Sequence, residues 1–328
     1  LIPIVAAGGI SARFTGKGRL PQRPIGIYLD CLPKAGVYCQ TQGGLPLSIN
    51  GKLRPGIFSL PGDVSSQFVT GFLFALPLLD GDSDIRLTTP LQSAGYVDMT
   101  IDIMREFGVG IEKTEQGWHI PGGQNYRSRS FTVEGDWSQA AFFLAAGALG
   151  NKPVCIKGLR IPSTQGDSAA AEIFARFGAK IEQGDGEVTV YPSVLHGIEI
   201  DASQVPDLVP ILAVTGALAQ GETRITGAAR LRIKESDRLT AMADGINRLG
   251  GKVTELPDGL VIKGVPSFTG GSAEGCNDHR VVMALSVGAL KASGPVEITD
   301  AHSICKSYPT FFEDYNALGG HANVIHMG

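Results

Sequence analysis

The stretch NDHRVVMALSVGALKAS, residues 277–293, decides the fold because three other parts of the chain repeat its pattern. These are PGDVSSQFVTGFLFALPLL at 61–79, EGDWSQAAFFLAAGALG at 134–150 and VPDLVPILAVTGALAQG at 205–221. In each stretch, an aspartate precedes an almost continuously apolar run. The four aspartates are Asp63, Asp136, Asp207 and Asp278, separated by 73, 71 and 71 positions. Self-similarity at a fixed period predicts a fold built from repeated units.

A second marker has nearly the same period. Amphipathic stretches end in an apolar residue followed by a glycine at Gly36, Gly108, Gly178, Gly250 and Gly319, spaced by 72, 70, 72 and 69 positions. The spacing before Gly250 predicts one apolar helix face, made of Leu239, Met242, Ile246 and Leu249. Gly250 is then expected to end this helix in the left-handed conformation, which glycine adopts without steric cost.

Each unit is predicted to have the same order of elements. The aspartate caps the N-terminus of a helix that is apolar on all sides and therefore buried. A strand, the one-sided helix and two short strands around a turn follow. The turns are Glu115-Gln116-Gly117, Gly184-Asp185-Gly186 and Pro257-Asp258-Gly259. The order helix, strand, helix, hairpin places the chain in the α/β (α+β) class.

The ends of the chain interrupt this pattern. Residues 1–9, LIPIVAAGG, are interpreted as the end of a helix whose start is absent, so we expect the first domain to be incomplete. The hairpin after Gly319 would lack its second strand. The polar stretch GGQNYRSRS, residues 122–130, has no periodicity and predicts a domain boundary. We therefore expect domains at 1–129 and 130–328.

Composition excludes several classes of protein. A chain of 328 residues with 43% hydrophobic residues is expected to form about two soluble globular domains. A net charge of −4 argues against nucleic-acid binding. The longest apolar run is shorter than the roughly 20 residues that span a bilayer. The five cysteines include no CxxC pair, which argues against a disulfide scaffold or a zinc ribbon.

Charged and hydroxyl residues gather where the apolar helices begin. Ser65, Ser66 and Gln67 lie in one first turn, where they serve either as caps or as an anion site. The run RLRIKESDRL, residues 230–239, has two interpretations. It forms an exposed charged face with internal pairs, or Lys234 and Arg238 share a helix face and hold an anion between them.

Two further cations lie near helix starts. Arg280 follows Asp278 in the first turn of an apolar helix, where a cation opposes the helix dipole unless an anion compensates. Lys306 is placed similarly, ahead of an aromatic helix. The histidines show no metal-ligand spacing, and neither a Walker motif nor GxGxxG occurs, so no metal or cofactor is predicted.

Seven stretches, in order, resemble the signature sequences of the EPSP synthases, the 3-phosphoshikimate 1-carboxyvinyltransferases. They are PGDVSSQFVTG, LQSAGYVDMT, VEGDWSQAAFFLAAGAL, VPDLVPILAV, RIKESDRL, NDHRVVMALSV and KSYPTFFEDY. The resemblance covers essentially the whole chain. The combination of RIKESDRL, NDHR and KSYP is highly specific to this family.

The resemblance implies a two-domain enolpyruvyl transferase fold of βαβαββ units, with the active site in the cleft between the domains. It implies transfer of the enolpyruvyl group of phosphoenolpyruvate to the 5-hydroxyl of shikimate 3-phosphate, with release of phosphate. This is a step of the shikimate pathway of aromatic amino acid biosynthesis. The resemblance implies no cofactor. Glyphosate competes for the phosphoenolpyruvate site in this family.

The resemblance also implies a role for individual residues. Those that would bind shikimate 3-phosphate are Ser65, Ser66, Gln67, Ser93, Tyr96, Asp207 and Lys234. Those that would bind phosphoenolpyruvate are Arg23, Gln67, Lys234, Arg238, Arg280 and Lys306. Lys234 and Lys306 are also expected to act in catalysis. Asp207 would take the proton from the 5-hydroxyl, and Glu235 would protonate the methylene carbon.

Parts of the family pattern have no counterpart here. The N-terminal Lys-Ser segment and the Gly-Asn-x-Gly-Thr stretch are missing, so we expect the chain alone to be weakly active or inactive. Two alternatives are a non-catalytic, complementing fragment that binds shikimate 3-phosphate and a UDP-N-acetylglucosamine enolpyruvyl transferase. The second family usually carries a cysteine shortly before the Arg-Pro that matches Arg23-Pro24, and none occurs here. A monomer in the cytoplasm, or in the plastid stroma of a plant, is expected.

Overall fold

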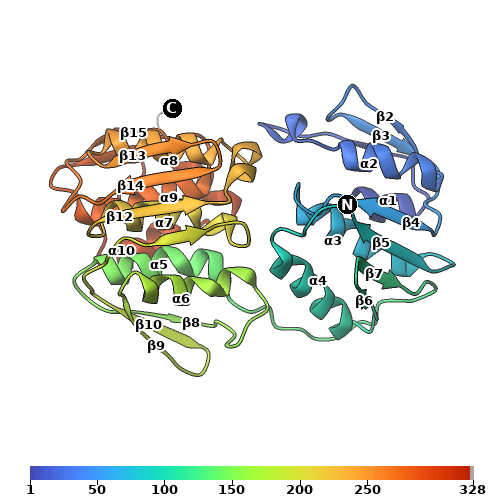
Figure 1. Cartoon of the computed structure of the whole chain (residues 1–328), viewed down its shortest axis with the longest axis horizontal. Coiled ribbons are helices and arrows are strands. Elements are labelled where there is room, and N and C mark those ends of the chain that lie inside the picture. Colours follow the sequence, from blue (N-terminus) through green and yellow to red (C-terminus); the bar gives the residue numbers. More distant parts are fainter. Residues whose placement is uncertain (326–328) are drawn as a thin grey trace. The chain divides into compact units, whose positions relative to one another are not determined.

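The computed structural model describes residues 1–325 and divides the chain into two compact units (Figure 1). Unit 1 comprises Leu1–Thr132 with Thr164–Gly166, and unit 2 comprises Val133–Ser163 with the chain from Asp167 onward. The division after Thr132 lies close to the predicted boundary after residue 129. In the described part of the chain, no helix is both long and apolar enough to cross a bilayer.

Unit 1 contains one complete βαβαββ unit and a shorter part before it. The complete unit consists of β4 Ile57–Leu60, α3 Ser66–Ala75, β5 Ser83–Leu87, α4 Ala94–Glu106, β6 Glu112–Thr114 and β7 Gly117–Ile120. Its sheet has the order β4-β5-β7-β6, and only β4 and β5 are parallel. The earlier part consists of α1 Ile2–Ala7, β1 Ala12–Phe14, α2 Gly26–Cys31, β2 Tyr38–Gln40 and β3 Leu47–Asn50. Its antiparallel sheet has the order β1-β3-β2.

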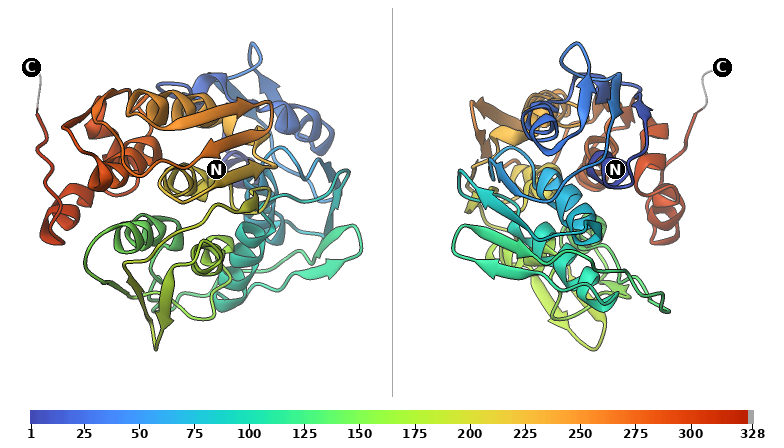
Figure 2. Two further views of the ribbon diagram at one scale, coloured as in Figure 1. Left: turned by 60° about the vertical axis from the view of Figure 1, so that its left-hand side comes forward. Right: turned by 90° about the vertical axis from the view of Figure 1, so that its right-hand side faces the viewer.

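Unit 2 contains three repeats of the same kind. The first has α5 Trp137–Leu149, β8 Val154–Lys157, α6 Ala170–Arg176, β9 Lys180–Gln183 and β10 Glu187–Tyr191. The second has β11 Glu199–Asp201, α7 Val209–Ala217, β12 Glu222–Thr226, α8 Arg238–Arg248, β13 Lys252–Leu256 and β14 Gly259–Lys263. The third has β15 Gly271–Ala273, α9 His279–Gly288, β16 Val296–Ile298 and α10 Phe311–Ala317. Figure 2 shows the β9–β10 hairpin at the lower edge of this unit.

Three sheets of unit 2 surround its apolar helices. Their orders are β8-β10-β9, β11-β12-β14-β13 and β15-β16. Every residue of α7 and α9 is buried, and in α5 only Ala146 is not. These three helices pack against one another. Fully burying each Leu or Phe side chain contributes roughly 1.5–3 kcal/mol, so these helices supply much of the driving force for folding. The prediction of buried, all-apolar helices is confirmed.

The glycine marker is also confirmed. All five predicted glycines have φ between 83° and 99°, in the left-handed region: Gly36, Gly108, Gly178, Gly250 and Gly319. The three predicted hairpin turns connect β6 to β7, β9 to β10 and β13 to β14. The face predicted from Leu239 to Leu249 is buried against the core. These features depend on local backbone geometry and apolar spacing, which the sequence displays directly.

The prediction that all four aspartates cap their helices is half wrong. Asp136 and Asp278 do cap α5 and α9. At α3 the cap is Ser65, which accepts the Gln67 amide, while the Asp63 carboxylate accepts the Thr89 hydroxyl at 2.8 Å.

Asp207 does not cap α7 either. It lies in a 3-10 turn, Pro206–Leu208, and the helix begins only at Val209. The residue three positions after Asp207 is Pro210, which has no amide proton to donate. One of the two bonds that an aspartate cap makes is therefore not available at this position, and the Asp207 carboxylate has other partners.

Two further differences, and one agreement, concern the edges of the repeats. The periodicity missed the short strands β4, β11 and β15 that precede the apolar helices, because three or four residues show too little alternation. α1 agrees with the helix expected at residues 1–9. The described residues 320–325 form no strand of the hairpin expected after Gly319, and residues 326–328 lie outside the described part.

The polar segment predicted as a domain boundary, residues 122–130, packs against unit 1 through hydrogen bonds. The Gln124 side chain donates to the Gly110 carbonyl at 2.9 Å, and the Tyr126 hydroxyl donates to the Phe74 carbonyl at 3.1 Å. The backbone of Arg127 donates to the Phe107 carbonyl at 2.8 Å. Residues 122–130 are therefore an ordered part of unit 1, although they contain no helix or strand.

Candidate active site

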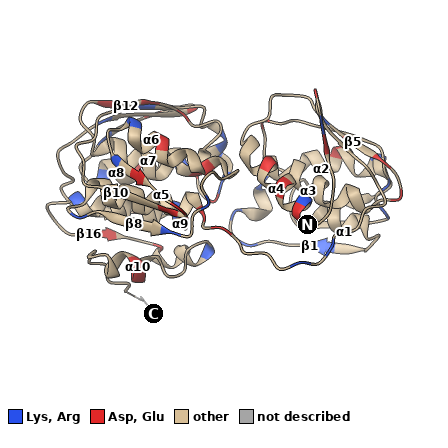
Figure 3. Cartoon of the chain, turned by 90° about the horizontal axis from the view of Figure 1, so that it is seen from below, with Lys and Arg blue, Asp and Glu red and all other residues tan. Residues whose placement is uncertain are grey.

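Three helix starts of unit 2 place charged side chains together. Neither α5 nor α7 contains a Lys, Arg, Asp or Glu (Figure 3). The charged groups of this part of unit 2 lie in the turns before α7, α8 and α9 and in the first turns of α8 and α9. The cluster, called the charged cluster below, consists of Asp207, Lys234, Glu235, Arg238, Asp278 and Arg280.

Arg238 is the centre of the charged cluster, with only 2% of its side chain exposed. Its Nε donates to Asp278 Oδ2 at 2.9 Å, its Nη1 to Asp207 Oδ1 at 2.8 Å and its Nη2 to Glu235 Oε2 at 2.7 Å. Burial opposes its charge, but the carboxylates of Asp278, Asp207 and Glu235 raise the Arg238 pKa further above its usual value. A buried cation is tolerated only with such partners.

Asp207 faces three cations at once. Besides Arg238, its carboxylate lies 3.6 Å from Lys234 Nζ and 3.5 Å from Arg280 Nη2. Burial alone would raise the pKa of Asp207, but the charges of Arg280, Lys234 and Arg238 outweigh it and hold the pKa well below its usual range. Asp207 is therefore ionised in the ligand-free chain.

Lys234 follows the 3-10 turn Ala229–Ile233 and is partly exposed. Burial lowers its pKa, while Asp207 partly restores it. Its contact with Asp207 is longer than that of Arg238, so an added anion can compete for the Lys234 ammonium group. Lys306, at the end of the 3-10 turn Ala301–Lys306, donates to the carbonyl and to Oδ1 of Asn277, the residue before Asp278. The structure thus brings Lys306 beside the start of α9.

Residues 230–239 had two interpretations, an exposed face with internal ion pairs and a pair of cations that holds an anion. The first describes Arg232, and the second concerns Lys234 and Arg238. Arg232 forms internal pairs with Asp237 at 3.0 Å and Glu255 at 2.7 Å, as the charged-face interpretation requires. Lys234 and Arg238 belong to the charged cluster instead. The prediction that these two share a helix face is wrong, because α8 begins only at Arg238. They meet through Asp207 Oδ1, which both contact.

The site residues predicted in unit 1 lie at the starts of α3 and α4. Ser65 and Ser66 begin α3 with Gln67, and Ser66 is buried. Ser93 precedes α4 in a left-handed conformation with φ 55°, and Tyr96 lies in the first turn.

Hydrogen bonds tie the two loops before α3 and α4 together. The Gln92 amide donates to the Gly62 carbonyl at 3.0 Å, and the Gly62 amide donates to Thr89 Oγ1 at 2.9 Å. Arg23 follows the 3-10 turn Leu20–Gln22 in the first part of the unit.

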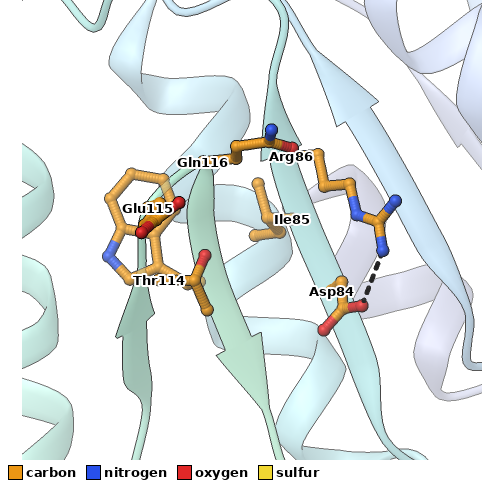
Figure 4. A pocket seen from close by; sticks show the side chains of 7 residues that line it. Asp84, Ile85, Arg86, Thr114, Glu115 and Gln116 are labelled. Atoms are coloured by element: carbon orange, nitrogen blue, oxygen red, sulfur yellow. Dashed lines mark hydrogen bonds and ion pairs between the residues drawn. The ribbon is translucent and has the colours of Figure 1, made fainter.

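A depression elsewhere on unit 1 contains none of the predicted site residues. It has a volume of about 430 Å³ and is lined by Asp84, Ile85, Arg86, Thr114, Glu115, Gln116 and Trp118 (Figure 4). Asp84 and Arg86, both on β5, pair with each other at 3.5 Å at its edge. Among the described residues, no group of three His, Cys, Asp or Glu side chains is arranged to hold a metal ion.

The chain matches the family model of EPSP synthase (3-phosphoshikimate 1-carboxyvinyltransferase) over residues 1–315. The chain belongs to the EPSP synthase family. The predicted resemblance is thereby confirmed, and so is the two-domain α/β fold that it implied.

Two bacterial relatives and one solved structure illustrate the match. The 3-phosphoshikimate 1-carboxyvinyltransferase of Clostridium novyi is 46% identical over the whole of this chain and 76% of its own length. That of Clostridium kluyveri is 45% identical over the whole of this chain and 77% of its own length. The EPSP synthase of Acinetobacter baumannii superposes with a TM-score of 0.80 at 29% identity, covering 97% of this chain and 76% of that one. These matches lend no support to the expectations of an incomplete first domain and of a weakly active or complementing fragment.

Sequence reasoning missed two members of the family site's surroundings. The sequence indicates Asp278 only as a helix cap, yet its other oxygen accepts a hydrogen bond from Arg238 Nε. Ser138 was not singled out, although it contacts Arg280 across 142 positions of the chain. The signal that could have indicated Asp278 is Arg280, two positions after it, since a cation at a helix start needs a nearby carboxylate.

Proposed function

We propose that the chain transfers the enolpyruvyl group of phosphoenolpyruvate to the 5-hydroxyl of shikimate 3-phosphate and releases phosphate. One observation supports this best: a member of the EPSP synthase family holds Lys234, Arg238 and Arg280 around Asp207 within the charged cluster. This arrangement suits a small, highly charged anion. We further infer that the enzyme works as a monomer in the cytoplasm.

The cations are proposed to bind phosphoenolpyruvate. Arg280 and Lys234 contact Asp207 at 3.5 and 3.6 Å, distances at which a substrate oxygen can replace the carboxylate. Charge-assisted hydrogen bonds to phosphate and carboxylate groups are among the strongest in proteins, particularly where water is excluded. Arg238 is proposed to bind the substrate by exchanging one of its carboxylate partners. Lys306 adds a partly solvated cation beside them.

Two carboxylates are proposed to move the protons. Glu235 protonates the methylene carbon of phosphoenolpyruvate, which makes the adjacent carbon cationic. The 5-hydroxyl adds to that carbon, and Asp207 takes the hydroxyl proton. The tetrahedral adduct then loses phosphate and a proton from the methyl group, which regenerates the enolpyruvyl double bond.

The low pKa of Asp207 makes it a weak base in the ligand-free chain. When an anionic substrate recruits Arg280 and Lys234, these cations stabilise the Asp207 carboxylate less, and its pKa rises toward the range that general base catalysis needs. Substrate binding would therefore activate its own base.

The starts of α3 and α4 are proposed to bind shikimate 3-phosphate through Ser65, Ser66, Gln67, Ser93 and Tyr96. Hydroxyl groups and free amides at a helix N-terminus favour phosphate. Ser93 is held there in a left-handed conformation, which is uncommon for serine and typical of binding loops. Arg23 and Gln67 are assigned to phosphoenolpyruvate by the family pattern alone.

Phosphate release tests this proposal. It is measured with both substrates, with each alone, and with the variants Lys234→Ala and Lys263→Ala. Release needs both substrates, and Lys234→Ala lowers its rate by about 100-fold or more, as expected for removing one group that stabilises developing charge. Lys263→Ala changes an exposed lysine of β14 and keeps the rate. Release from phosphoenolpyruvate alone, or full activity of Lys234→Ala, contradicts the proposal.

A further inference from the structure

A hydroxyl group links a carboxylate to a guanidinium beside the charged cluster. Ser138 Oγ lies 2.6 Å from Asp136 Oδ1 and 2.9 Å from Arg280 Nη2. Asp136 and Ser138 belong to the start of α5, and Arg280 belongs to the first turn of α9. Both the serine and the arginine are buried, with 3% and 7% of their surface exposed.

The two partners fix the polarity of this hydroxyl. An ionised carboxylate only accepts hydrogen bonds, and a guanidinium only donates them. Ser138 must therefore donate its single proton to Asp136 and present a lone pair to Arg280. Both hydrogen bonds are charge-assisted, and their short distances agree with this.

Ser138 provides the closest of the hydrogen bonds that hold the Arg280 guanidinium. The other contacts of Arg280 are longer. Arg280 Nη1 donates to the Asp207 carbonyl at 3.3 Å, and Arg280 Nη2 lies 3.5 Å from Asp207 Oδ2. The second contact is the one that an anionic substrate would displace. The bond to Ser138 does not involve Asp207, so Nη2 keeps an acceptor if the Asp207 carboxylate is displaced.

Capping of α5 does not need the Ser138 hydroxyl. Asp136 caps the helix by accepting the backbone amides of Ser138 at 2.8 Å and Gln139 at 3.3 Å. Alanine at position 138 keeps both amides. The side chain at this position can therefore be changed without removing the cap.

We propose that Ser138 is a positioning residue, which aims the Arg280 guanidinium at phosphoenolpyruvate by accepting from Nη2 while donating to Asp136. This inference rests on the proposed role of Arg280 in binding that substrate. Ser138 itself contacts neither substrate. Its loss frees the guanidinium to rotate, which weakens binding of phosphoenolpyruvate and leaves binding of shikimate 3-phosphate unchanged.

The test compares the variants Ser138→Ala and Ser138→Cys with the unsubstituted chain. A hydrogen bond to a charged group contributes about 1.5–3 kcal/mol, so KM for phosphoenolpyruvate rises by about 10- to 100-fold in both variants. A thiol accepts hydrogen bonds poorly and nearly keeps the volume of serine. KM for shikimate 3-phosphate changes by less than about twofold, and Ser138→Thr, which keeps a hydroxyl, recovers most of the loss.

A buried serine on α9 provides the matched control. Ser286 is 6% exposed, and its hydroxyl donates only to the Val282 carbonyl, within the helix. Ser286→Ala removes one buried hydrogen bond and leaves KM for phosphoenolpyruvate unchanged. An equal rise in both KM values for Ser138→Ala, or the same effect for Ser286→Ala, overturns the proposal.

A double-mutant cycle separates this inference from the proposed function. Arg280→Lys alone tests the role of Arg280: an unchanged KM for phosphoenolpyruvate contradicts the proposed function. Given a rise, Ser138→Ala is added to Arg280→Lys. If Ser138 acts through Arg280, the second substitution adds little, whereas independent effects multiply. Multiplying effects overturn the positioning role while the proposed function stands.

Discussion

The starts of α5 and α7 occupy equivalent places in the repeat, and they use the same residue differently. Asp136 accepts two backbone amides and caps α5, whereas Asp207 is not the N-cap of α7 and faces Lys234, Arg238 and Arg280. Pro210 removes one amide that Asp207 would otherwise accept, and the 3-10 turn moves the helix start beyond it. A change in local backbone thus releases a carboxylate from capping and makes it available for chemistry.

The largest expected effect follows from exchanging these two aspartates for asparagine. Asparagine caps a helix about as well as aspartate, but it takes no proton at neutral pH. Asp207→Asn should lower kcat by about 10²- to 10⁴-fold, the usual contribution of a general base, while Asp136→Asn keeps most of the activity. Steady-state kinetics of the two variants measures the difference. Comparable losses in both would mean that the two helix starts do not differ in function.

The start of α9 extends the comparison to pH. Burial and the neighbouring charge of Arg280 lower the pKa of His279 to about 4. The folded chain then binds fewer protons than the unfolded chain below about pH 6.5, so stability falls as the pH decreases. For this group we expect a loss of about 2 kcal/mol between pH 7 and pH 5.

Asp207 titrates in a different window from His279. Its lowered pKa contributes stability above the usual carboxyl range, and that contribution is lost only as the pH falls below about 4. Urea unfolding at pH 7 and pH 5 therefore isolates the histidine from Asp207. The decrease in the free energy of unfolding from pH 7 to pH 5 should be smaller in His279→Gln than in the unsubstituted chain. An unchanged loss of stability in that variant would assign it to other groups that titrate between pH 5 and pH 7.

The smallest expected effects concern capping itself. Asp136→Ala should destabilise the chain by about 1 kcal/mol, because two amides of α5 lose their acceptor. Asp63→Asn should change stability by less than about 0.5 kcal/mol, because Ser65 caps α3 and asparagine can still accept the Thr89 hydroxyl. Chemical denaturation resolves the first change. A cost for Asp63→Asn as large as that for Asp136→Ala would contradict this expectation and would assign the loss to the charge of Asp63, because asparagine keeps the hydrogen-bonding ability of aspartate.

The sequence predicted the features of the fold that depend on residues close together in the chain. Gly250 and its four counterparts were found because a left-handed helix end requires glycine at a fixed place in the period. The burial of α7 followed from its lack of any polar face. The start of the same helix was predicted wrongly, because a cap depends on which amides remain available after Pro210.

The site was only partly accessible to sequence reasoning. The family pattern supplied Asp207, Lys234 and Arg238, but spacing alone suggested a shared helix face that does not exist. Asp278 and Ser138 hold Arg238 and Arg280 across 40 and 142 positions of the chain. No local pattern can indicate which carboxylate meets which guanidinium at such separations.

The contacts around Arg238 and Arg280 have a consequence for how this chain can change over time. Ser138 comes from the first repeat of unit 2, Asp207 and Arg238 from the second, and Asp278 and Arg280 from the third. Each repeat looks like an exchangeable module, yet each supplies one partner of a hydrogen bond or an ion pair whose other partner lies in a different repeat. The repeats must therefore have diverged together, and a single one cannot be swapped for its neighbour without leaving a buried charge unmatched.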